Sequence, residues 1–370
     1  MKLCQGRIGR QETLAAAAVA VAVSGIFTTD TASLYGEGNS AYVSTPVAAG
    51  LALLAFLLVA RAMQKGEHKT LFALLEHGFG GVLSRVVAFF YAGLLVFCAA
   101  ALLSRFSLML GRFVYPDASE WQVLLYPLAA AFALAWLGLE SIGRMSRLFA
   151  WVMLISILGA LALAAYNYEP YRLAPFLGDG FDHMTSMALR NVALYFPGML
   201  ALLVLARGVH GVTAAKRAGY GAGIAAGVLG SLCQVCLGMT YTYQDLALMH
   251  SPMYRLTMNF RSGGFYPRLD LLLLMGWVIS GMLAAGFYLY AAALLFAEAF
   301  LQQDIRPAVL AAAAAAGAAS MLMHVDNMVF RAIGSYISLY GWIFAVAPAL
   351  LASLISVMRN AGKPKKEVSA

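Results

Sequence analysis

The sequence predicts an all-α membrane protein with about ten transmembrane helices. Apolar residues make up 62% of the 370-residue chain and charged residues only 11%, and the mean hydropathy is +0.78. A soluble domain carries about 25% charged residues, so most of this surface must face lipid. In lipid every backbone polar group needs an internal partner, which leaves helices or a closed barrel. Apolar runs such as 87–103 and 269–297 are far longer than the alternating strands of a barrel, so helices are predicted.

Ten segments are apolar enough to cross a bilayer, which takes about twenty residues. They are residues 13–34, 41–60, 86–110, 121–139, 148–166, 191–206, 220–243, 270–300, 307–323 and 333–357. A less apolar segment, residues 71–81, is expected to lie along the membrane surface. With no linker or soluble domain between them, residues 1–370 are expected to form one integral-membrane domain. Its two halves would be 11–166 and 191–357, followed by a basic tail at 358–370.

The positive charge indicates the topology. The net charge is +8, and 17 of the 25 Lys and Arg residues fall on one side if the N-terminus is inside. Cytoplasmic loops carry such an excess, so both ends are predicted to be cytoplasmic. The basic residues are expected to meet anionic lipid, not nucleic acid.

Other chemistry has little support in the sequence. Cys233 and Cys236 have CxxC spacing but lack nearby Cys or His residues that would complete a zinc site, so we interpret them as buried helix residues. No cofactor, metal or catalytic residue is predicted. An intramembrane enzyme is disfavoured because no nucleophile–base pair is spaced along a helix. The apolar run after the first basic residues leads into further spans, so it is interpreted as a helix and not as a cleaved signal peptide.

Two interruptions lie five helices apart. Residues 24–30 (SGIFTTD) interrupt the first span and residues 195–198 (YFPG) interrupt the sixth. Glycine weakens a helix and proline removes a backbone donor, so both segments are expected to unwind. Either alone is more typical of an ordinary kink. Interrupted helices at matching positions of two inverted halves instead indicate a transporter-type substrate site, and Asp30 is either part of it or a helix cap.

Four strings in order resemble one family. Residues 138–144 read GLESIGR and precede Phe149, residues 9–11 read GRQ, residues 173–180 read LAPFLGDG, and residues 268–270 read RLD before Trp277. The set is similar to the spore germination permeases, which are the B subunits of GerA-type germinant receptors. That family belongs to the amino acid–polyamine–organocation superfamily, and the resemblance covers nearly the whole chain.

The resemblance implies a LeuT-like fold of five plus five inverted helices, with helices 1 and 6 broken. It also implies a small germinant, usually an amino acid, bound among helices 1, 3, 6 and 8. The implied partners are an A-type membrane subunit and a C-type lipoprotein in the bacterial inner membrane, specifically the inner membrane of the spore. Binding would shift a two-state helix bundle whose state the partners detect.

The candidate site residues come from these four helices. Broken backbone would hold the charged ends of the ligand, and aromatic rings would enclose its side chain. The predicted set is Ser24, Gly25, Phe27, Thr28, Phe97, Ala101, Tyr195, Phe196, Gly198 and Tyr288.

Two departures from the family pattern touch this site. Thr28 and its successors stand where the family often has a proline, and Met199 stands where it often has an acidic residue. Two other functions therefore stay open. One is an autonomous secondary transporter for amino acids or amines, and the other is a structural subunit that binds no ligand.

Overall fold

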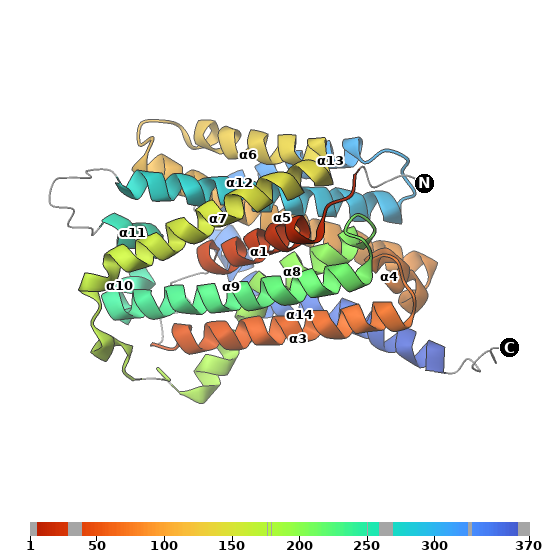
Figure 1. Ribbon diagram of the computed structural model, residues 1–370, viewed down its shortest axis with the longest axis horizontal. Helices are drawn as coiled ribbons and strands as arrows, with labels where there is room; N and C mark the ends of the chain where they lie inside the picture. The colour runs from red at the N-terminus through yellow and green to blue at the C-terminus, as the bar shows by residue number, and fades with distance from the viewer. Residues whose placement is uncertain are drawn as a thin grey trace, which may run out of the picture.

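The computed structural model describes residues 6–28, 39–175, 177–178, 180–249, 251–258, 269–324 and 328–361, and over these residues it is all helical (Figure 1). Asp30, Arg268 and the tail beyond Ala361 lie outside them. The α-helices are α1 (Arg10–Phe27), α3 (Ala41–Lys65), α4 (Leu71–Phe79), α5 (Gly81–Phe113), α6 (Glu120–Leu137), α7 (Leu139–Ala164), α8 (Phe181–Val204), α9 (Val212–Thr240), α10 (Tyr243–Leu248), α11 (Pro252–Met258), α12 (Leu269–Ala299), α13 (Arg306–His324) and α14 (Met328–Ala361). Short 3₁₀ turns are η1 (Ala165–Asn167), η2 (Pro170–Leu173) and η3 (Leu205–Arg207).

Nine of the described helices are long and apolar enough to span a membrane: α3, α5, α6, α7, α8, α9, α12, α13 and α14. The one predicted span outside this set is the first in the sequence, which corresponds to α1. The first turn of α1 carries the charges of Arg10 and Glu12. The start of α1 and the end of α14 lie at the same end of the bundle, as the charge pattern predicts (Figure 1).

Helix α1 runs through the centre of the bundle. It lies against α7, α8, α9 and α12, and every residue from 19 to 27 is buried. Its sequence there is mostly alanine and valine, and such small side chains let neighbouring helices approach closely. α1 is therefore enclosed by protein, and its backbone is shielded from lipid.

The predicted interruption of the first span takes the form of a helix end. α1 is continuous through Ser24 and Gly25 and stops at Phe27. Thr28 closes the last turn, because its N–H and its hydroxyl both donate to the Ser24 carbonyl, at 3.2 and 2.5 Å.

The predicted break in the sixth span was wrong. α8 is a continuous helix of 24 residues that contains Pro197. It starts ten residues earlier than expected, because Met184, Met187 and Ala188 share one buried face that extends the helix. All residues from 195 to 204 are buried, so packing on every side holds the helix together although proline costs about 3 kcal/mol in a helix interior.

The GLESIGR motif holds the start of the chain. Gly138, at φ 92°, joins α6 directly to α7 in a backbone region that favours glycine. Glu140 pairs with Arg144 at 3.2 Å and accepts a bond from the backbone N–H of Arg7 at 3.4 Å. A Cβ on Gly143 would lie 2.7 Å from the Ile8 side chain. The motif therefore docks residues 6–9 onto α7.

The predicted surface segment is α4, which packs against α14. A Cβ on Gly78 would come within 3.0 Å of the α14 backbone at Ala352. Two imidazoles converge beside this contact: His68 Nε2 and His77 Nδ1 lie 3.0 and 3.1 Å from the Ser356 hydroxyl. Burial lowers the pKa of His68, and the charge of His77 lowers it further.

A side chain from α5 enters the hydrogen-bond ladder of α14. The Tyr91 hydroxyl donates to the Ala345 carbonyl at 3.0 Å and accepts from the Ala349 N–H at 2.8 Å. Those two groups would bond each other in a regular helix. Pro348, between them, removes one further donor, so Tyr91 joins the two halves of α14 at its weakest turn.

Candidate ligand site

The last turn of α1 meets α12 through two hydroxyls. Ser24 Oγ and Tyr288 Oη lie 2.9 Å apart, and Tyr288 also donates to the Ala20 carbonyl at 3.4 Å. Tyr288 is fully buried, and a buried phenol needs such partners. The pair fixes α12 to α1 one turn before α1 ends.

Tyr195 of α8 fills the space between α1 and α9. A Cβ on Gly25 would lie 2.5 Å from its ring, and a Cβ on Gly230 would lie 2.8 Å from its hydroxyl. Only glycine fits at both positions without displacing the ring. Tyr195 is 1% exposed, and its hydroxyl has no hydrogen-bond partner in the described part of the chain. Such a group costs about 1–3 kcal/mol, so the site has an unfilled polar position.

Gly198 lies one turn further along α8. A Cβ there would meet the Tyr288 hydroxyl and the Val21 side chain, each at 2.8 Å. Gly198 therefore lets α8 pack closely against side chains of α1 and α12. Its neighbour Phe196 is fully buried in the core.

Aromatic rings close the site at the end of α1. The Phe27 ring lies 5.3 Å from both Phe106 of α5 and Trp277 of α12, in tilted geometry. Trp277 is fully buried, and its indole N–H has no partner among the described residues. Such a cluster offers ring faces to an apolar or cationic group and one indole donor to a polar group.

A small cavity adjoins this cluster. Its lining includes Phe27 and Arg105, with Gln234 of α9 and residues 251–253 before and within α11. Its volume is about 20 Å³, which is room for about one water molecule. The site is therefore closed in this conformation, and a ligand the size of an amino acid needs side chains such as Tyr195 to move.

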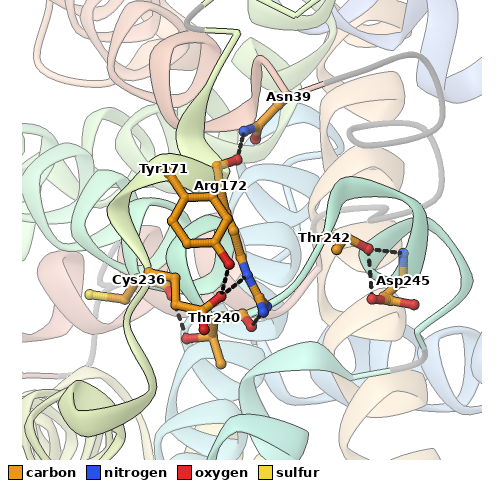
Figure 2. Close-up of polar contacts among 8 residues, drawn as sticks. Asn39, Tyr171, Arg172, Cys236, Thr240, Thr242 and Asp245 are labelled. Carbon is orange, nitrogen blue, oxygen red and sulfur yellow. Dashed lines mark hydrogen bonds and ion pairs between the residues drawn. The ribbon is translucent and has the colours of Figure 1, made fainter.

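The connection into α8 is tied to the C-terminal end of α9. Arg172 of η2 donates to the Thr240 carbonyl and pairs with Glu169 at 2.5 Å, and Asn39 donates to the Arg172 carbonyl at 2.6 Å (Figure 2). Hydrogen bonding from Tyr171, with smaller contributions from Arg172, holds the pKa of the Glu169 carboxyl below its usual value. This clamp sets where α8 enters the bundle.

The structure brings together seven of the ten predicted residues. Ser24, Gly25, Phe27, Thr28, Tyr195, Gly198 and Tyr288 all belong to the contacts above. Phe196 supports them from the core. Phe97 and Ala101 are half-buried on α5 and lie outside the packed core of the described chain.

Sequence reasoning missed the residues that face the predicted ones. Phe106, Gly230, Gln234 and Trp277 lie in uniformly apolar helices whose pattern does not indicate a direction. Arg105 of α5 also lines the cavity. Gly230 could have been identified from its place within a membrane helix, because a glycine there often marks a close approach between two helices.

The family model for spore germination proteins matches residues 11–328. The chain belongs to the spore germination protein family. No curated protein matches it. Among solved structures, it is similar to a Na⁺-coupled sialic acid symporter in a substrate-bound, outward-open state, with a TM-score of 0.68 and 10% identity. The match covers 99% of this chain and 92% of the symporter.

At that identity the likeness shows the fold alone, which is the LeuT-like transporter fold predicted from the family resemblance. The spore germination protein is accordingly a permease-like membrane protein. The two broken helices that the resemblance implied take the form of a helix end in α1 and an unbroken, proline-containing α8.

Proposed function

We propose that this protein is the permease-like subunit of a spore germinant receptor. It binds a small amino acid or amine between α1, α5, α8 and α12. It signals to an A-type membrane subunit and a C-type lipoprotein in the bacterial inner membrane, specifically that of the spore, with both its ends cytoplasmic. The observation that carries the proposal is the Tyr195 hydroxyl, which is buried against Gly25 and Gly230 without a hydrogen-bond partner among the residues that the structure describes.

A ligand can shift a two-state protein only by its difference in affinity for the two states. In this protein Tyr195 would supply the difference in ligand affinity between the two states. In the closed packing its hydroxyl has no hydrogen-bond partner within the described segments, whereas a ligand between α1 and α8 would provide one. The rings of Phe27 and Trp277 would enclose the ligand side chain, and backbone carbonyls at the end of α1, which lies at Phe27, would face an ammonium group.

The test is a thermal-shift screen of the purified protein against the common amino acids and small amines. A compound that binds the folded state raises its stability by mass action. We expect at least one compound to raise the melting temperature of the wild type and of the control Tyr126→Phe, whose side chain is 67% exposed on α6. Tyr195→Phe should abolish that shift. If no compound shifts the wild type, the structural-subunit alternative gains support.

The fold also favours a second candidate, an autonomous transporter, because the similar solved structure is a symporter. Purified protein in liposomes distinguishes the two. Accumulation of a labelled amino acid by this chain alone would support transport, whereas ligand binding without flux would support the receptor.

A further inference from the structure

Two cavities open side by side at the end of the bundle where α1 begins. The larger, about 790 Å³, lies between the loop after α3 and the start of α9. The smaller, about 430 Å³, lies between the start of α1 and the start of α9. His210 and Thr213 line both, so the two form one groove.

The groove has a cationic rim. Arg7, Lys69 and Arg207 line the larger cavity, and Arg10 and Arg217 line the smaller one, against a single carboxylate from Glu67. Within the described ranges, only Arg207 of these five has a carboxylate partner, Glu298 at 3.7 Å. The four other side chains therefore present uncompensated charge to the groove.

The smaller cavity becomes apolar as it leaves the rim. Leu14 of α1 and Ala214 and Ala218 of α9 form its walls. Leu14 then lies over the next turn of α9, where a Cβ on Gly221 would be 2.8 Å from its Cδ1. A cationic mouth that leads into an apolar crevice between two helices fits an amphiphile with an anionic head.

We propose that this groove binds an anionic phospholipid, with its phosphate against Arg10 and Arg217 and an acyl chain along Leu14 and Ala218. Basic pockets between membrane helices recognise such headgroups in general. The apolar walls decide between occupants, because an acidic peptide or a free phosphate would leave them unfilled.

The bound lipid would contact α1 at its first turn. Arg10 is the first residue of α1, and Gly25 of the candidate ligand site lies fifteen residues further along the same helix, roughly 22 Å at 1.5 Å per residue. The bound lipid would therefore hold the start of the helix whose far end forms the ligand site.

The test uses the full chain in a neutral detergent, with phosphatidylglycerol, phosphatidylcholine or inorganic phosphate added. Native mass spectrometry measures retained lipid, and thermal unfolding measures stabilisation. We expect phosphatidylglycerol alone to be retained and to stabilise. Arg10→Gln/Arg217→Gln should bind it about 30-fold more weakly, from two lost charge contacts. The matched control is Arg85→Gln/Arg147→Gln, which removes equal charge from exposed side chains outside both cavities.

Equal weakening in both double variants would assign binding to diffuse surface charge and overturn the proposal. Equal stabilisation by inorganic phosphate would overturn it in favour of a soluble anion. If the first variant does not fold, wild-type protein still decides. Retention of phosphatidylglycerol should fall steeply as salt approaches 1 M, where the screening length is about 3 Å, and retention unchanged by salt would refute a charge-held headgroup.

Discussion

Replacing Tyr195 with Phe removes one oxygen atom from the middle of the bundle and keeps the ring that fills the space beside Gly25. Because that hydroxyl has no hydrogen-bond partner in the part of the chain that the structure describes, its removal should relieve a desolvation cost of about 1–3 kcal/mol. The unliganded variant should therefore be at least as stable as the wild type. Tyr288→Phe makes the same chemical change at an equally buried ring but removes bonds to Ser24 and Ala20. It should lose about 0.5–1.5 kcal/mol for each bond.

The assay is thermal unfolding of the three proteins in the same detergent without ligand. A chain of this size shifts by roughly 2 °C or less per kcal/mol, so replicate melts must resolve half a degree. The expected order of melting temperature is Tyr195→Phe at or above wild type, then Tyr288→Phe below both. A clear drop for Tyr195→Phe would show that its hydroxyl has a partner in the resting protein and would remove the reason for placing a ligand there.

Three further predictions use other parts of the fold. Gly281→Ala would place a Cβ in steric conflict with one edge of the Phe106 ring and should cost about 1–3 kcal/mol. Gly93→Ala, with open space around it, should instead gain about 0.5–1 kcal/mol, and thermal unfolding compares the two variants. Because the folded pKa of His68 is lowered, the contact between α4 and α14 should be intact above pH 6.5 and weaken below it, and hydrogen exchange in α4 should show this in wild type but not in His68→Gln. Arg172→Gln should speed exchange in residues 169–175, and an unchanged rate would show that the backbone contacts there suffice without the clamp.

The positions of the spans could be predicted because bilayer thickness fixes their length. The prediction of 270–300 differs by one residue at each end from α12. The interruptions could not be predicted to the same standard. Proline and glycine lower the stability of a helix, but their presence does not determine whether the helix breaks. Pro197 stays helical because the surrounding helices enclose it.

The candidate site was predictable as a neighbourhood but not as a set of contacts. Gly25 and Gly198, the matching glycines of the first and sixth spans, both lie where a Cβ would meet a neighbouring helix. The bond between Ser24 and Tyr288 joins residues 264 positions apart, and their spacing along the chain carries no information about it. Phe106 instead of Phe97 faces the site because the rotation of α5 is set by packing against α12, and a uniformly apolar helix does not encode that rotation.

Tyr91 gives α14 an unusual dependence on its neighbour. A proline-containing helix normally bends about its own missing bond, but here the bond across that turn passes through a phenol from α5. Bending α14 at Pro348 therefore requires either that α5 shifts or that the hydrogen bonds of Tyr91 break. α5 also carries Phe106 and Arg105 to the candidate ligand site. A shift of α5 that accompanies bending of α14 would therefore also move these two side chains.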